Sequence, residues 1–257
     1  MNGNIFDSHA HYDDAAFDED RWELLDSLPA KGVGAVINAA TDPHSARRLL
    51  DLATRYPYMR TAVGIHPEAA GRATDDWLTE IYRLSLKPGV CAIGEIGLDY
   101  HYEDACPREE QLRWFRMQLA LAAERNLPVI IHDREAHEDT LALLREYRPR
   151  GVVHCFSGSV EMMQEVVALG MYIGLGGVTT FKNARRPAAV AAAVPADRLL
   201  LETDAPYMAP EPCRGRRCDS SLIIHTASHI ASLRGEDTEA LLRQTWDNAC
   251  RLFEIKL

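Results

Sequence analysis

Two histidines and three carboxylates fall within eight residues near the start of the chain. The stretch Asp-Ser-His-Ala-His-Tyr-Asp-Asp occupies positions 7–14, and one residue separates its two histidines. In an extended strand, side chains two residues apart point to the same face, so His9 and His11 are predicted to face the same way. This pair is either part of a metal chelate or a chance arrangement. The remaining polar residues of the chain help to decide between these readings.

Residues of the types that bind metals or move protons also close several other apolar runs. They are His66, Glu95, His132, His154 and Asp204. A single histidine at a strand end is more often an ordinary polar side chain than a ligand. A carboxylate flanked by Ile93 and Ile96 is harder to explain in that way, because a buried charge needs a partner or a metal. A chance arrangement would require an independent coincidence of residue type and location at every one of these positions. A shared metal site is therefore favoured.

Short apolar runs alternate with longer amphipathic segments along the whole chain. The eight runs cover residues 4–11, 32–40, 59–67, 90–99, 128–133, 151–158, 171–177 and 198–206. Strand followed by helix, repeated eight times in about 250 residues, predicts a closed (β/α)8 barrel of the TIM type. Strands buried on both faces would explain why the runs are continuously apolar. No linker or repeat divides the sequence, so residues 1–257 are expected to form a single domain.

The segments between the runs carry helix signals. In residues 108–126, the apolar side chains Leu112, Phe115 and Leu119 fall on one helical face. Asp42 followed by Pro43 is typical of an N-cap and a first helical residue. In such a barrel the carboxyl ends of all strands meet at one mouth, where active sites are assembled. The polar residues that close the runs are therefore predicted to become neighbours.

The number of ligand-type residues indicates two metal ions. Four imidazoles and two carboxylates exceed the three protein ligands of a typical catalytic ion. We expect Glu95 to bridge two ions, with three further ligands on one ion and two on the other. These are His9, His11 and Asp204 for the first ion and His132 and His154 for the second. Mixed nitrogen and oxygen ligands suit Zn²⁺ or Mn²⁺, whereas Mg²⁺ would need more oxygen ligands or water.

Two such ions predict hydrolysis by metal-activated water. A pair about 4 Å apart would activate a bridging water and hold the attacking and leaving oxygens of a displacement at phosphorus. Asp204 is expected to accept the proton from that water. The chain offers no Gly-x-Ser-x-Gly elbow, and Cys155 next to His154 is interpreted as a structural thiol.

Composition limits the remaining function classes. The chain has 257 residues, 47% of them hydrophobic, and a net charge of -10, which disfavours binding nucleic acid through the overall field. Metal ions and a few well-placed arginines can still bind phosphates locally. Without an apolar run of about 20 residues or a signal-like start, we expect a cytoplasmic protein with no membrane contact and no obligate protein partner. The six cysteines are expected to be reduced, with a Cys213–Cys218 disulfide or metal site as the alternative.

The ordered motifs resemble those of the TatD-type metal-dependent deoxyribonucleases, within the amidohydrolase-like metallohydrolases. They are DSHAHYDD, GIHP, GEIGLDY, PVIIHDREA, HCFSG, LLLETDAPYMAP and NACRLF. The resemblance covers nearly the whole chain and implies a divalent-metal nuclease acting on DNA, often as a 3'-5' exonuclease, here with single strands as the expected substrate. It assigns the same six residues as metal ligands, matches His66 to a phosphate contact, and matches Glu202 to a further metal position found in some members.

One segment departs from the family pattern. Where the family commonly has Asn-Glu-Pro after a basic stretch, this chain has Cys218, Asp219 and Ser220, so the conformation of that loop is open. The preceding arginines are retained, and phosphate contact is expected from Arg214, Arg216 or Arg217, with Arg216 preferred.

Other substrate contacts are expected around the mouth. Arg134 follows His132 and could bind a phosphate or pair with an acidic neighbour. Lys182, Arg185 and Arg186 form a basic patch or a solvated helix start. Five aromatic residues follow strand ends and could either stack on bases or pack into the core. They are Tyr12, Tyr100, Tyr102, Phe156 and Tyr207.

Two alternative functions stay open on these residues. The first is an amidohydrolase or lactonase on the same barrel, because activated water attacks carbonyl carbon as well as phosphorus. Relatives with that chemistry often use a carboxylated lysine where this chain has Glu95, which disfavours it. The second is a non-catalytic, metal-loaded interaction protein, which a complete ligand set with open positions argues against.

Overall fold

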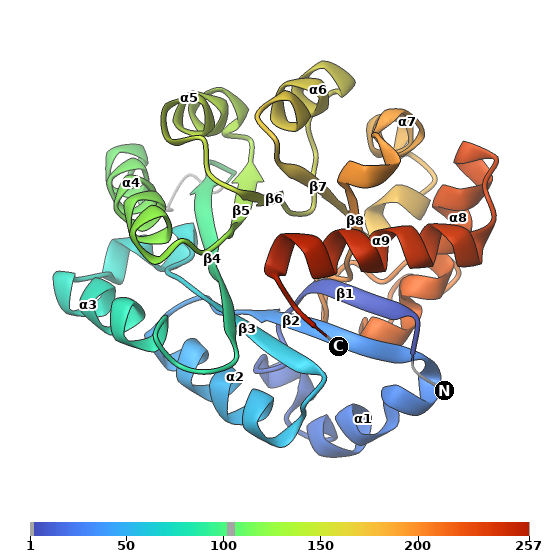
Figure 1. Ribbon diagram of the computed structural model, residues 1–257, viewed down its shortest axis with the longest axis horizontal. Coiled ribbons are helices and arrows are strands. Elements are labelled where there is room, and N and C mark those ends of the chain that lie inside the picture. The colour runs from blue at the N-terminus through green and yellow to red at the C-terminus, as the bar shows by residue number, and fades with distance from the viewer. Residues whose placement is uncertain (1–2, 102–105, 257) are drawn as a thin grey trace.

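The computed structural model describes residues 3–101 and 106–256, and its centre is a sheet of eight parallel strands in sequence order (Figure 1). The strands are β1 (Ile5–Ala10), β2 (Val33–Ala39), β3 (Met59–Val63), β4 (Val90–Asp99), β5 (Val129–Arg134), β6 (Gly151–Val153), β7 (Tyr172–Leu175) and β8 (Leu199–Leu201). Seven lie within the predicted apolar runs, and β5 extends one residue beyond its run, to Arg134. The predicted (β/α)8 barrel is therefore confirmed.

The sheet closes between its first and last strands. The Asp204 amide donates to the His9 carbonyl at 2.9 Å, and the His11 amide donates to the Ala205 carbonyl at 2.7 Å. These bonds lie just beyond the carboxyl end of β8. The segments that carry two candidate histidines and one candidate aspartate are thus joined by the barrel closure itself.

Helices surround the strands (Figure 1). They are α1 (Arg21–Ser27), α2 (Pro43–Arg55), α3 (Asp75–Leu84), α4 (Arg108–Arg125), α5 (His137–Tyr147), α6 (Val160–Ala168), α7 (Arg185–Ala193), α8 (Ile223–Arg234) and α9 (Thr238–Phe253). Short 3-10 helices include η1 (Ala15–Phe17), η3 (Pro67–Arg72), η4 (Gly177–Thr180) and η6 (Ser220–Leu222). None of the helices in the described ranges combines the length and apolarity needed to cross a membrane.

Local sequence signals explain where the helices begin. The Asp42 carboxylate accepts hydrogen bonds from the His44 and Ser45 amides, and Pro43 is the first residue of α2, as predicted. Helix α4 spans nearly the whole predicted segment and buries Phe115 and Leu119. The apolar faces of these helices pack on the outside of the strands to form the main hydrophobic core.

A second apolar cluster fills the barrel interior. It is built from strand residues such as Phe6, Ile37, Ile130 and Leu200, and α9 packs against it through Leu252 and neighbouring side chains. The interior is therefore a packed core below the mouth, which leaves only the carboxyl ends of the strands free to carry polar side chains.

Two features of the strands differ from expectation. Strand β4 continues to Asp99, so Glu95 lies inside the strand instead of at its end, and His132 likewise lies within β5. The pairing of β4 with β5 shifts register between Ile93 and Ile96, a bulge that redirects the intervening side chains. Glu95 therefore reaches the mouth by a local irregularity in the strand.

Candidate metal centre

Glu95 stands at the centre of a buried cluster of histidines. One carboxylate oxygen, Oε2, lies 3.2 Å from His9 Nε2 and 3.5 Å from His11 Nε2. The other, Oε1, lies 2.8 Å from His132 Nδ1 and 2.9 Å from His154 Nε2. Each oxygen of this carboxylate thus faces its own pair of imidazoles. This arrangement corresponds to a carboxylate able to bridge two ions.

Asp204 joins the first pair only. Its Oδ1 lies 3.7 Å from His9 Nε2 and 3.4 Å from His11 Nε2. Strand β8 ends at Leu201, and Asp204 has a positive φ of 61°, so the chain turns there out of the extended conformation. The aspartate reaches the mouth through this turn, close to the β1 histidines.

Hydrogen bonds to the far side of two rings set which nitrogen can bind a cation. His11 Nδ1 lies 2.8 Å from the Ala39 carbonyl oxygen, which can only accept, so Nδ1 carries the proton and Nε2 keeps a lone pair. His132 Nε2 lies 2.9 Å from Asp99 Oδ2, which leaves the lone pair on Nδ1. In both rings the free lone pair is on the side of Glu95. Such outer hydrogen bonds are typical of metal-binding histidines.

His66 has the opposite arrangement. Its Nδ1 accepts the Glu68 amide at 3.2 Å at the start of η3, so the proton of the neutral ring is on Nε2. That Nε2 lies 3.5 Å from Glu95 Oε1. A protonated nitrogen donates a hydrogen bond and does not bind a metal. His66 is therefore close enough to group with Glu95 and His132 by distance alone, but its ring presents a donor to the site.

The carboxylates of the cluster stay ionised. Burial would raise the pKa of Glu95, but the imidazoles of His154, His66 and His9 hold it well below its usual range. The pKa of Asp204 is also lowered, because its interactions with the imidazoles of His11, His154 and His9 outweigh the effect of burial. Two buried carboxylates that remain charged require positive charge beside them.

The donor set fits divalent cations. The Nε2 atoms of His9 and His11 lie only 3.0 Å apart, and the ligand-type atoms around Glu95 are separated by distances expected of atoms about 2.0–2.2 Å from a shared ion. Three of the buried atoms that have no hydrogen-bond partner among the described residues lie at this cluster: His9 Nδ1, His154 Nδ1 and Glu202 Oε2. Four imidazoles and two ionised carboxylates therefore form a site with the composition of a two-metal centre.

Glu202 faces away from Glu95. Its Oε1 accepts the Cys155 amide and lies 3.6 Å from His154 Nδ1, on the outer side of that ring. The turn at Asp204 breaks the alternation that would have put Glu202 and Asp204 on one face. Glu202 is also close enough to His154 and His9 to group with them as possible metal ligands, as the motif implied.

Two supporting carboxylates were not singled out from the sequence. Asp99 bonds to His132, as described above. Asp7, the first residue of the opening motif, is fully buried and accepts hydrogen bonds from the Thr203 amide at 3.0 Å and from the Thr203 and Ser220 hydroxyls at 2.6 Å each. Asp7 therefore ties β1 to the segment that carries Asp204. An acidic residue four positions after Glu95 in the same motif was the available signal for Asp99.

The atypical Cys218-Asp219-Ser220 segment is ordered by the same network. The Ser220 hydroxyl also lies 2.8 Å from the Tyr12 hydroxyl, and the Asp219 carboxylate accepts the Ser221 amide to cap η6. Cys213 and Cys218 are buried, and all six cysteines of the chain are free thiols. The alternative of a Cys213–Cys218 bridge was wrong.

The predicted phosphate-binding arginines have different environments. Arg217 forms a bidentate ion pair with Asp20, with N–O distances of 2.7 and 2.6 Å, so its guanidinium is engaged away from the cluster. Arg214 stacks on Phe181, with Cζ 3.7 Å from the ring centroid. Arg216 is exposed in the same loop, and Arg134 is half-buried at the end of β5.

Most of the predicted stacking aromatics are core or rim residues. Tyr12 and Phe156 are buried, and Tyr100 is half-buried with its hydroxyl donating to Asp139. Tyr207 is 52% exposed, and its hydroxyl donates to Asp14 at 2.8 Å. Tyr102 lies outside the described residues. Tyr207 is thus the one exposed member among the four that can be placed.

The barrel and this buried histidine–carboxylate cluster define a metal-dependent hydrolase. Comparison with known proteins agrees: residues 6–254 match the model of the family described as TatD related DNase. The chain is 39% identical over 254 residues to the uncharacterized metal-dependent hydrolase YabD of Bacillus subtilis, covering 98% of this chain and 99% of YabD. It is 35% identical over 259 residues to the 3'-5' ssDNA/RNA exonuclease TatD of Salmonella typhimurium, covering 98% and 99% of the two chains.

A solved structure is similarly close. The TatD homolog YjjV from Escherichia coli superposes with a TM-score of 0.94 at 32% identity, over 100% of both chains. The chain therefore belongs to the TatD family of metal-dependent hydrolases, as the motifs implied.

Proposed function

We propose that this protein is a two-metal phosphodiesterase that shortens single-stranded DNA from its 3' end. The observation that supports this most directly is the placement of the two Glu95 oxygens, one toward His9 and His11 and the other toward His132 and His154. Relatives named as 3'-5' ssDNA/RNA exonucleases support the substrate class.

In this proposal the ligands divide as the sequence predicted. His9, His11 and Asp204 would hold one divalent ion, His132 and His154 would hold the other, and Glu95 would serve both. Mg²⁺, Mn²⁺ and Zn²⁺ are the candidate ions. When bound, two such ions lower the pKa of a water and neutralise charge on the phosphate.

The protein's own groups supply orientation and proton transfer. Asp204 is ionised and close to the β1 histidines, so it accepts the proton of the attacking water. The Nε2–H of His66 donates a hydrogen bond to a phosphate oxygen, where charge increases in the transition state. Arg134 and Arg216 contact neighbouring phosphates. Burial of Glu95 and both β1 histidines keeps these electrostatic interactions strong.

The test is hydrolysis of single-stranded DNA and RNA oligonucleotides carrying a label at either the 3' or the 5' end. The protein is stripped with a chelator and refilled separately with Mg²⁺, Mn²⁺ or Zn²⁺. The proposal expects stepwise shortening of the 5'-labelled strand and early release of labelled mononucleotide from the 3' end, both dependent on metal. A metal-loaded protein that cleaves no phosphodiester but hydrolyses lactones or amides would replace it with the amidohydrolase alternative.

A further inference from the structure

The loops that follow β7 and β8 carry an unusual concentration of cations. Residues 177–186 and 208–217 contain six lysines or arginines and one acidic residue, Glu211, in a chain whose net charge is -10. Arg217 is neutralised by Asp20, which leaves five cations in the two loops. A local excess of this kind, within an acidic protein, marks a surface for a polyanion.

The two loops form one surface joined to the metal centre. The Glu211 amide donates to Thr180 Oγ1 at 2.8 Å, and a side chain at Gly177 would collide with the Met208 carbonyl oxygen, so the loops are in direct contact. Arg186 Nη1 donates to the Ser157 carbonyl at 3.5 Å, three residues beyond His154. The cations are therefore attached to the segments that follow two candidate ligand positions, His154 and Asp204.

Arg214 and Phe181 form a flat, stacked pair of side chains on this surface. The guanidinium stacks on the half-buried ring with Cζ 3.7 Å from the centroid, while Arg214 itself is exposed. A stacked guanidinium has its plane fixed and its outer face open, which is the geometry on which unpaired bases stack. Lys182, Arg185 and Arg186 are exposed beside it.

Acidic side chains border these loops on the side of β1 and β3. Asp14 follows β1 and accepts a hydrogen bond from the exposed Tyr207, and Glu68 is exposed directly after His66 and Pro67, with Arg72 as the cation of that loop. A nucleic-acid backbone is attracted to the β7–β8 side and repelled at Asp14 and Glu68.

We propose that a single-stranded nucleic acid leaves the cleavage site across the loops after β7 and β8, with one base stacked on the Arg214–Phe181 pair and its phosphates on Lys182, Arg185 and Arg186. This inference rests on the proposed function, because it places the non-cleaved part of the same substrate. DNA and RNA share the chemistry involved.

The test uses the metal-loaded protein and fluorescent, phosphorothioate-linked dT and rU dodecamers, which keep the backbone charge and resist cleavage. Binding is measured by fluorescence anisotropy at several salt concentrations. Replacing both Arg185 and Arg186 with Ala is expected to flatten the slope of log Kd against log salt by about 0.7 for each lost phosphate contact. Arg214→Ala is expected to weaken binding about tenfold. Arg214→Lys keeps the charge and therefore keeps the salt slope while losing affinity.

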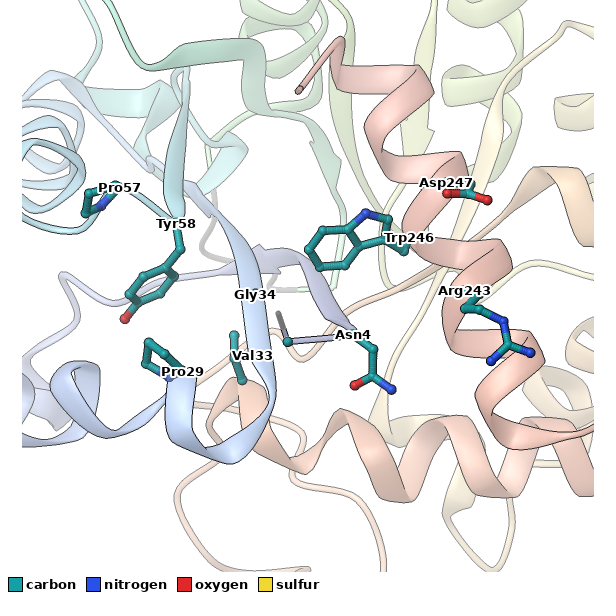
Figure 2. A pocket seen from close by; sticks show the side chains of 10 residues that line it. Asn4, Pro29, Val33, Gly34, Pro57, Tyr58, Arg243, Trp246 and Asp247 are labelled. Atoms are coloured by element: carbon teal, nitrogen blue, oxygen red, sulfur yellow. The ribbon is translucent and has the colours of Figure 1, made fainter. Parts of the chain in front are cut away.

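Arg243→Ala is the matched control. Arg243 is an exposed arginine of α9 that lines a hollow at the amino end of the barrel with Val33 and Trp246 (Figure 2). Its removal changes the net charge by the same amount as Arg214→Ala and is expected to leave binding unchanged. Equal weakening by Arg243→Ala and the β7–β8 variants, or no weakening by the latter, would overturn the proposed path.

A separate assay of the wild-type protein with bis(p-nitrophenyl) phosphate distinguishes the two proposals. Hydrolysis of this small diester without oligonucleotide binding would reject the path and leave a phosphodiesterase. Oligonucleotide binding that depends on Arg214, without hydrolysis of any phosphodiester, would support the path and reject the proposed function.

Discussion

The two ends of the barrel use the same eight strands for different purposes. At the amino end, Phe6 and Ile37 pack with residues of α9, and Phe6 meets the Trp246 ring edge-on at a centroid distance of 5.4 Å. At the carboxyl end, Glu95 is buried among imidazoles. One end removes apolar area from water, and the other holds charges that need a cation. Residues at the amino end of the barrel thus contribute to stability, and residues at the carboxyl end provide the groups for chemistry.

The volume of a hollow does not identify the functional end of this barrel. A hollow of about 720 Å³ opens at the amino end, lined by apolar groups such as Tyr58 and Trp246 (Figure 2). Its charged residues, Arg243 and Asp247, are exposed. The convergent polar groups that hydrolysis requires are at the other end of the barrel.

The largest expected effect on activity is at the centre of the carboxyl end. Glu95→Ala removes the carboxylate that faces both imidazole pairs, so hydrolysis should fall to the level of the metal-stripped protein and metal content should fall with it. Elemental analysis and the oligonucleotide assay measure both. The same substitution at the amino end, Glu239→Ala, removes an exposed carboxylate that accepts from Asn4 and should leave both unchanged. Unchanged turnover in Glu95→Ala would reject the two-metal site.

The next effect separates a hydrogen-bond donor from a ligand. His66→Ala removes an Nε2–H directed into the site, which should lower kcat about 100-fold with metal content retained. His66→Gln keeps a donor and should recover part of the loss. A loss of metal in either variant would show that His66 is a ligand and that the tautomer inferred from Glu68 is wrong.

A smaller effect is expected at Asp99, which is hydrogen-bonded to the candidate ligand His132. Asp99→Asn replaces the acceptor of His132 Nε2–H with an amide that can donate, which favours the tautomer whose Nδ1 is protonated and cannot bind metal. Metal affinity should fall about 10- to 100-fold. Titration of the stripped protein with Mn²⁺ or Zn²⁺ measures this directly, without reference to turnover. Two ions bound with wild-type affinity would assign Asp99 a purely structural role.

Most of the fold could be predicted because it depends on patterns local in the sequence. Each strand is a short apolar run, and caps such as Asp42 act within a few residues. The cluster could also be predicted, because a closed barrel brings the carboxyl ends of its strands together. The positions of Glu95 and His132 inside their strands could not, since the bulge in β4 depends on its pairing with β5.

Asp7 and Arg217 contact residues that are distant in the sequence and become neighbours only in the folded protein. Asp7 was not singled out from the sequence, because its role depends on hydrogen bonds with Thr203 and Ser220, which are 196 and 213 positions away. Arg217 looked like a phosphate contact, but Asp20 neutralises it. A long side chain in a loop can reach several partners, and the sequence alone does not show which of them lies closest in the folded protein.

The smallest effect on activity, with a clear effect on stability, is expected at the amino end. Trp246→Ala removes a partly buried ring that packs on Phe6 and covers Gly34. Truncating a large core aromatic costs about 3–5 kcal/mol when burial is complete, so about 2–3 kcal/mol is expected here. That corresponds to a lowering of Tm by about 4–10 °C, measured by thermal unfolding.

Turnover of Trp246→Ala below its Tm should stay within about twofold of the wild type, because a packed interior of Ile37, Ile130 and Leu200 separates the deleted ring from the mouth. Metal titration of the same variant provides the sharper comparison with Asp99→Asn. A drop in metal affinity of similar size in both would mean that packing below the mouth sets the spacing of the ligands, since β1 carries both Phe6 and His9. Unchanged affinity would confirm that the two ends are energetically independent.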